Sequence, residues 1–227
     1  MIFFIVLKAC GLGAWVKIDF IDNELCNNST SLFVVLEHKQ VYSRIMEFSR
    51  IIGLCGCMHG CPENQHKWIF CKSNISAEKV EVSEQFVTTK IIIGVSSCYI
   101  SFVYAKCDSS LGEDLWQGLI SFNPGENVWL VGGDINVILE NLEKGGNLYS
   151  WKARKDFSSF MTQIGLMVLG YEGDRYTWCN KVYVSLAVTW IGLWPQHSHH
   201  LVKVFHLSRS VSSLSDYGLI IGVYRPK

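Results

Sequence analysis

A polar pair just after an apolar run is the sharpest chemical feature of the sequence. Residues 128–131 are apolar, two glycines follow, and Asp134 and Asn136 come next. The glycines would let the chain turn or let a ligand approach the backbone closely. Side chains two residues apart on a strand point the same way, so Asp134 and Asn136 would face one site and hold a water and a phosphate oxygen together. A plain polar turn is the alternative interpretation.

Two further carboxylates occupy comparable positions. Glu37 follows the apolar run 32–36, and Asp216 comes shortly before the apolar run 219–223. Mg²⁺ typically takes few protein carboxylates, together with waters and substrate phosphate oxygens. Each acid alone fits a solvated strand end. Three such acids in one chain make a site for a hard cation a hypothesis worth testing.

Strands must bring these residues together, and strand patterns dominate the sequence. Several apolar runs are continuous, as expected of strands covered on both faces. Helical spacing of apolar residues is rarer. The strands are expected at 2–7, 32–36, 91–95, 99–104, 128–131 and 219–223, and the helices at 15–26, 109–121 and 152–164. Their alternation predicts an α/β or α+β class, with sheets packed together and helices outside.

Composition limits the classes of protein. The chain has 227 residues, of which 49% are hydrophobic and 18% charged. This excludes intrinsic disorder and fits a single domain over residues 1–227. Twenty basic residues balance 20 acidic ones, so the chain as a whole lacks the basic character of a strong nucleic-acid binder.

The first residues are interpreted as a buried strand. Residues 1–7 are apolar but lack a basic start, Lys8 closes the run, and no apolar run is long enough to cross a bilayer. We therefore expect an intracellular protein of the nucleus or cytoplasm that does not engage a membrane, with the nine cysteines as thiols.

A series of short motifs extends over nearly the whole chain. The central one is WLVGGDIN over 129–136. The others are Gly11-Leu12-Gly13, Leu36-Glu37-His38-Lys39, Phe102-Val103-Tyr104, Gly145-Gly146, Phe157 and Phe160, 165–170, Tyr176-Thr177-Trp178, 206–209 and Ser215-Asp216-Tyr217. In this order they resemble the endonuclease/exonuclease/phosphatase (DNase I-like) superfamily, and within it the plant non-LTR (LINE-type) retrotransposon endonuclease branch, whose central motif reads W-L-x-x-G-D-F-N.

The resemblance implies a four-layered α/β sandwich, two packed mixed β-sheets flanked by helices, with the site at one end of the sheets. By the same resemblance, Glu37 and Asp216 would bind Mg²⁺ or Mn²⁺. Asp134 would position and deprotonate the attacking water, and Asn136 would orient it and the scissile phosphate. Tyr104 would donate a hydrogen bond to the phosphate. The implied partner is DNA, bound weakly because the net charge is zero.

Three departures from the family pattern predict a decayed site. The first-strand asparagine is replaced by Lys8 or Ala9, and residues 181–189 contain no aspartate where the family has R-L-D-R. Tyr217 stands where the family has the histidine that stabilises the pentavalent phosphate. Losing one positioned acid–base group commonly costs about 10²–10⁴-fold in rate. We therefore expect weak or no catalysis. We also expect the protein to be a monomer.

Three hypotheses of function remain open: an impaired metal-dependent endonuclease, a non-catalytic nucleic-acid-binding remnant with the same fold, and an unrelated metal-binding or scaffold protein. For the third hypothesis the sequence offers cysteines and histidines as possible zinc ligands, although their spacing matches no structural-zinc pattern with two close cysteine pairs. The residues concerned are Cys55, Cys57, His59, Cys61, His66 and Cys71. The first two hypotheses place Glu37, Asp134, Asn136 and Asp216 in one cleft.

Overall fold

The computed structural model describes the backbone of fourteen segments of the chain. These are residues 2–8, 31–38, 40–54, 56–59, 67–93, 95–106, 112–137, 151–168, 172–173, 178–180, 184–186, 190–193, 201–211 and 214–225. The predicted helix over 15–26 lies outside them.

The first sheet has the strand order β10-β14-β15-β1-β2-β4-β3. In this sheet β1 runs parallel to β2 and antiparallel to β15, and β2 runs antiparallel to β4. The strand bounds are β1 Ile2–Lys8, β2 Leu32–Leu36, β3 Gly56–His59, β4 Lys67–Cys71, β10 Glu172–Gly173, β14 Leu201–Val211 and β15 Leu214–Arg225.

The second sheet has the order β5-β6-β7-β8-β13-β9. Here β7 and β8 are parallel, and the other neighbouring strands are antiparallel. A separate pair joins β11 to β12. The bounds are β5 Ser76–Val82, β6 Phe86–Ile93, β7 Ser96–Tyr104, β8 Trp129–Asp134, β9 Met167–Val168, β11 Trp178–Asn180, β12 Val184–Leu186 and β13 Trp190–Leu193.

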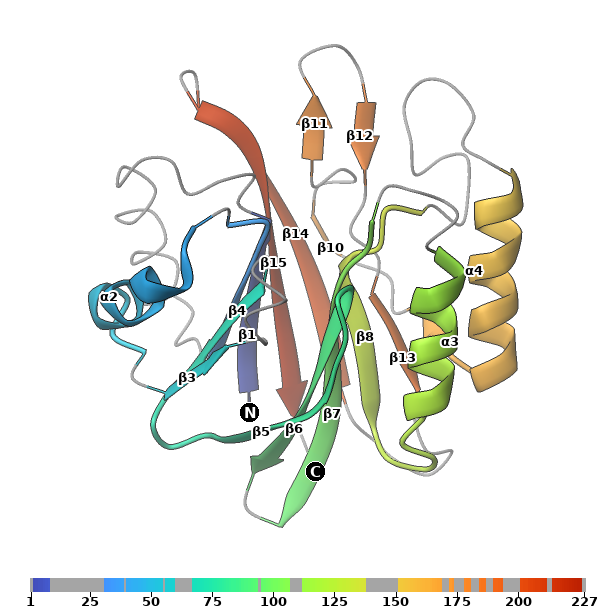
Figure 1. Ribbon diagram of the computed structural model, residues 1–227, viewed down its shortest axis with the longest axis horizontal. Helices are drawn as coiled ribbons and strands as arrows, with labels where there is room; N and C mark the ends of the chain where they lie inside the picture. Colours follow the sequence, from blue (N-terminus) through green and yellow to red (C-terminus); the bar gives the residue numbers. More distant parts are fainter. Residues whose placement is uncertain are drawn as a thin grey trace.

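Helices cover the outer faces of the two sheets (Figure 1). A 3₁₀ turn, η1 Tyr42–Arg44, leads into α2 Ile45–Ile51, whose Phe48 packs on Trp68 and Phe70 of β4 with ring centroids 5.8 and 5.5 Å apart. On the other side, α3 Gly112–Phe122 and α4 Trp151–Ile164 pack on the second sheet. The result is the expected four-layered sandwich of two mixed sheets flanked by helices.

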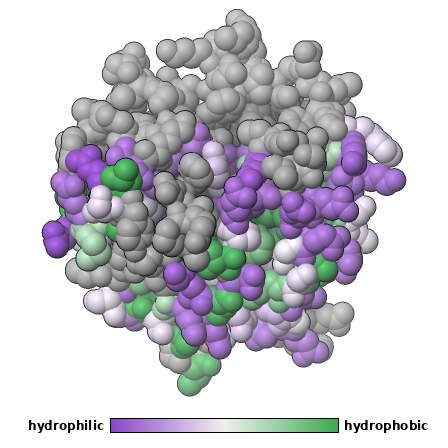
Figure 2. All heavy atoms as spheres, viewed as in Figure 1, coloured by the Kyte–Doolittle hydropathy of each residue, from purple (hydrophilic) through white to green (hydrophobic). Residues whose placement is uncertain are grey.

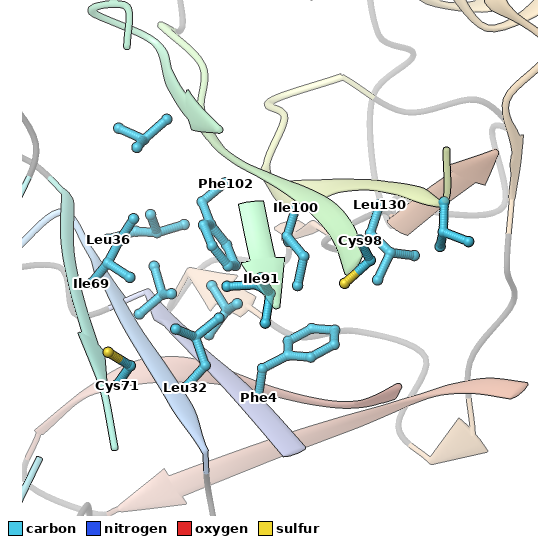
Figure 3. Close-up of a cluster of buried hydrophobic side chains, with 14 residues drawn as sticks. Phe4, Leu32, Leu36, Ile69, Cys71, Ile91, Cys98, Ile100, Phe102 and Leu130 are labelled. Atoms are coloured by element: carbon cyan, nitrogen blue, oxygen red, sulfur yellow. The ribbon is translucent and has the colours of Figure 1, made fainter. Parts of the chain in front are cut away.

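The core between the sheets is built from alternate residues of the inner strands. Phe4, Leu32 and Leu36 of the first sheet meet Phe102 and Leu130 of the second (Figure 3). Alternation along β8 explains why its whole run is apolar, since Leu130 faces this core while Trp129 and Val131 face α3 and α4. The prediction that continuous apolar runs are strands buried on both faces is confirmed for β2 and β8.

Most predicted elements are present with small shifts in their bounds. The runs 2–7, 32–36, 99–104 and 128–131 correspond to β1, β2, β7 and β8, and 219–223 lies inside β15. Residues 91–93 of the run 91–95 form the end of β6, and Val95 lies in the turn before β7. The helix predicted at 109–121 corresponds to α3, with 109–111 outside the described residues, and the helix predicted at 152–164 corresponds to α4.

The surface is mixed in polarity. On the face in Figure 2, polar residues cover much of the described surface, with smaller apolar areas between them. Among the helices that the structure describes, none combines the length and hydropathy that crossing a bilayer requires.

Candidate functional site

Tyr104 and Asp134 lie side by side at the ends of the parallel strands β7 and β8. They are register partners, and the backbone N–H of Ala105 donates to the Asp134 carbonyl at 2.8 Å. Asp134 is only 5% exposed, whereas Tyr104 is half-buried and packs against the core between the sheets. Carboxyl ends of parallel strands are the usual location of ligand sites in α/β sheets. The pairing therefore places a carboxylate-bearing residue beside a phenol-bearing residue at that edge.

Gly133 allows β8 to pair closely with β7. Its φ is +129°, and a Cβ there would overlap the Val103 carbonyl oxygen and lie 3.0 Å from the Val103 nitrogen. Both atoms belong to the neighbouring strand rather than to an open site. The glycine is thus required for strand contact at Asp134, which differs from the expectation of a turn or a ligand approaching the backbone.

Asn136 does not continue the strand. β8 ends at Asp134, and Asn136 has φ 53°, in the left-handed region that Asn tolerates better than most residues. Its Nδ2 donates to the Ala105 carbonyl at 2.6 Å. The two-residue alternation expected from the sequence therefore ends before Asn136, and the bond to Ala105 sets the orientation of its amide beside Asp134 and Tyr104.

Glu37 follows β2 directly and also has a left-handed backbone, with φ 55°. This conformation costs an ordinary L-residue roughly 1–2 kcal/mol. The next residue is firmly packed: the buried His38 ring stacks on Trp68 with centroids 3.9 Å apart, and its Nδ1 accepts the Gln40 N–H at 3.0 Å. Strained residues held by such surroundings cluster at functional sites.

The strand register places Asp216 and Tyr217 at the same end of the first sheet as Glu37. Gly218 of β15 lies opposite Lys8, the last residue of β1, and Lys8 lies opposite Leu36, the last residue of β2. Because β15 is antiparallel to β1, Asp216 and Tyr217 come just before Gly218 on the side where Glu37 follows Leu36. Tyr217 is the register partner of Arg209 in β14.

The two pairs of parallel strands run in the same direction. In Figure 1, β1 in dark blue runs upward from the N-terminus, and β7 in green runs upward from its hairpin with β6. Because β2 is parallel to β1 and β8 is parallel to β7, both sets of carboxyl ends lie at one end of the sandwich. That end carries Glu37 and Asp216 on one sheet and Tyr104 and Asp134 on the other.

Lys67 is a buried residue at this end that sequence analysis missed. It begins β4 opposite Leu36, is fully buried, and donates from Nζ to the Glu84 carbonyl at 2.7 Å. Burial lowers its pKa to about 7, and the nearby Glu84 carboxylate opposes this shift. The only signal in the sequence was a lysine heading the apolar segment KWIFC, which a solvated strand end explains equally well.

The zinc hypothesis gains no support from the described residues. Within them, no three His, Cys, Asp or Glu side chains gather as metal ligands would. Cys71 is a free, buried thiol of the core, and burial raises its pKa, which disfavours the thiolate that zinc requires. The backbones of Cys57 and His59 lie on β3, while Cys55, Cys61 and His66 lie outside the described residues.

A groove of about 200 Å³ lies elsewhere, on the helical layer between α3 and α4. Trp116 and Phe160 form part of its lining, with ring centroids 4.9 Å apart. Its lining contains none of the candidate site residues Glu37, Tyr104, Asp134, Asn136, Asp216 and Tyr217.

Comparisons with known proteins identify the fold. No family model and no curated protein matches the sequence. Solved structures do match over almost the full length of the chain. The 3′ phosphatase NExo from Neisseria, bound to a product DNA hairpin, has a TM-score of 0.71 and 14% identity, with 99% of this chain and 100% of that chain covered.

Two further structures are similar. The endonuclease domain of TRAS1, a telomere-specific non-LTR retrotransposon, has a TM-score of 0.68 and 15% identity, covering 96% and 97% of the two chains. The beta toxin of Staphylococcus aureus with bound magnesium ions has a TM-score of 0.63 and 10% identity, covering 98% and 99%. The chain therefore has the α/β fold of the endonuclease/exonuclease/phosphatase proteins.

Proposed function

We propose that this chain binds a divalent cation and the phosphodiester backbone of DNA where its two sheets end, as a metal-dependent endonuclease of retrotransposon origin whose hydrolysis is impaired. The observation that carries the proposal is the alignment of Tyr104 with Asp134 across parallel strands, with Asn136 oriented beside them through Ala105. The motifs that resemble the plant LINE-type branch support the finer assignment.

The residues present fit a magnesium or manganese ion. Such ions bind through one or two protein carboxylates and retain several waters. Glu37 and Asp216 would provide these carboxylates, because the strand register places both residues at the same end of the first sheet. When bound, the cation would neutralise negative charge on the phosphate oxygens.

The chain's own residues would position the water and the phosphate. The Asp134 carboxylate would accept a proton from the attacking water, and Asn136 would hold that water and a phosphate oxygen. The Tyr104 hydroxyl would donate a hydrogen bond to the phosphate. Asp134 is suited to this task because its strand is fixed by the pairing with β7 on one side and β13 on the other.

Impairment follows from three substitutions relative to the family pattern. Lys8 or Ala9 replaces the asparagine near the metal, the aspartate of residues 181–189 is absent, and Tyr217 replaces the histidine. A neutral phenol donates one hydrogen bond but brings no positive charge to the phosphate. The zero net charge further weakens binding to DNA, because Lys and Arg contacts with phosphates dominate that affinity.

Plasmid nicking tests the proposed activity. With Mg²⁺ or Mn²⁺ the native chain should nick slowly, and Tyr217→His should nick faster. In the Tyr217→His background, Asp134→Asn should lower the rate by about 10²–10⁴-fold, because it removes the general base without changing its shape. Nicking that is unaffected by Asp134→Asn would contradict the assignment of this site.

The non-catalytic alternative is distinguished in the same series. If neither the native chain nor Tyr217→His nicks, but both bind duplex DNA more tightly with Ca²⁺ than without, the chain is a binding remnant. The absence of both nicking and cation-dependent binding would overturn the proposal.

Glu37 provides a separate test that does not need turnover. Glu37→Gly and Glu37→Ala should both lose Mn²⁺ affinity, measured by electron paramagnetic resonance, because both remove the carboxylate. Only glycine relieves the left-handed backbone, so Glu37→Gly should be more stable than Glu37→Ala by about 1 kcal/mol in urea unfolding. Retained Mn²⁺ affinity in both variants would exclude Glu37 as a ligand.

A further inference from the structure

Lys67 is a buried amine that the proposed chemistry does not use. It lies opposite Leu36 at the end of the first sheet where Glu37 follows, and it is fully buried. Burying an amine costs free energy that an apolar side chain of similar length would not. Its Nζ donates a hydrogen bond to the Glu84 carbonyl, and this bond indicates which part of the protein Lys67 holds in place.

That bond passes from one sheet to the other. Glu84 lies in the turn 83–85, which joins β5 to β6 of the second sheet, and the Nζ–oxygen distance is 2.7 Å. The turn is itself ordered by Ser83, whose Oγ accepts the backbone N–H groups of Gln85 and Phe86 at 3.2 and 3.0 Å. Lys67 therefore fixes a turn that has its own internal hydrogen bonds.

The same turn holds the end of β7. The Gln85 carbonyl accepts the Tyr104 N–H at 2.8 Å, and Gln85 Oε1 accepts the Lys106 N–H at 2.9 Å. Glu84 Oε1 also pairs with Lys106 Nζ at 2.6 Å, although that pair is largely exposed. Two hydrogen bonds, joined by the backbone of Glu84 and Gln85, thus connect Lys67 with Tyr104, whose register partner is Asp134.

We propose that Lys67 is a positioning residue, which fixes Tyr104 and Asp134 relative to Glu37 by tying the first sheet to the turn 83–85 of the second. An apolar residue at this position would fill the core equally well but would remove the hydrogen bond from the first sheet to the Glu84 carbonyl. The inference deepens the proposed function and rests on it only for the DNA-binding measurement below.

Amide hydrogen exchange of the Lys67→Met variant tests this link between the two sheets and does not require an activity assay. Methionine has a similar length and no charge, so the variant is expected to fold. Protection of the Tyr104 amide should fall at least tenfold, because its acceptor Gln85 is no longer held from the first sheet. The Ile100 amide, in the middle of β7 opposite Thr89, should keep its protection. Equal protection of Tyr104 in the native chain and the variant would overturn the proposal.

Affinity for a DNA duplex in Ca²⁺, followed by fluorescence anisotropy, supplies the functional measurement. Lys67→Met should bind roughly 3- to 30-fold more weakly while melting at a higher temperature, since coupling through a network is commonly of that size. A merely structural lysine would change stability without weakening binding. Lys72→Met, which removes a lysine just after the other end of β4, is the control for loss of one positive charge.

The outcomes separate the two ideas. If the native chain does not bind the duplex, the proposed function fails, and hydrogen exchange still decides the role of Lys67. If Lys67→Met does not fold, native-state exchange of the unaltered chain decides it. In that case the amides of Trp68 and Tyr104 should open together as denaturant is added, and separate opening would overturn the tie.

Discussion

Gly133→Ala is expected to leave little folded protein. A Cβ at this position would overlap the Val103 carbonyl oxygen, and the φ of +129° is one that residues other than glycine rarely adopt. Neither β7 nor β8 can move away easily, because both lie inside the second sheet with a neighbour on each side. We expect a loss of more than about 3 kcal/mol in the free energy of unfolding, measured in urea.

Gly125→Ala is the matched control. Gly125 also has a positive φ, +66°, but a Cβ added there would have no atom within 4 Å, in the turn before β8. Only backbone strain remains, and the expected loss is about 1 kcal/mol. Equal losses in the two variants would show that overlap with Val103 is not the reason for the glycine.

Sequence patterns predicted best the strands whose residues are all buried. β2 and β8 are buried on both faces and have continuous apolar runs, which few other elements produce. β5 was missed for the opposite reason. It is an edge strand whose residues are mostly exposed, and the segment SAEKVEV carries charges where an inner strand would be apolar.

The candidate site shows the same limit at the level of single residues. Asp134 could be placed at a strand end because an apolar run precedes it. The orientation of Asn136 could not be predicted, because it depends on a left-handed backbone and a bond to Ala105, a residue 31 positions away. The cross-sheet contact of Lys67 with Glu84 is likewise a tertiary feature with no local signature in the sequence.

Lys67 also predicts how the stability of the protein changes with pH. Its pKa is about 7 in the folded chain, against an ordinary value of 10.5. Between these values the unfolded chain holds a proton on Lys67 that the folded chain has lost, so raising the pH favours folding. Below pH 7 the penalty for burying the charge is fully present, and above about 10.5 it is absent.

Urea unfolding of the native chain and Lys67→Met between pH 6 and pH 9.5 measures this effect. Relative to Lys67→Met, the native chain should gain about 2 kcal/mol between pH 7 and pH 9, because each pH unit above the folded pKa contributes about 1.4 kcal/mol. The comparison cancels other groups that titrate in this range, and Lys72→Met controls for net charge. If the two stability curves run parallel, Lys67 is protonated in both the folded and the unfolded chain. Its bond to Glu84 would then be that of an ammonium group, and the stability gained on replacing it with methionine would be the same at every pH.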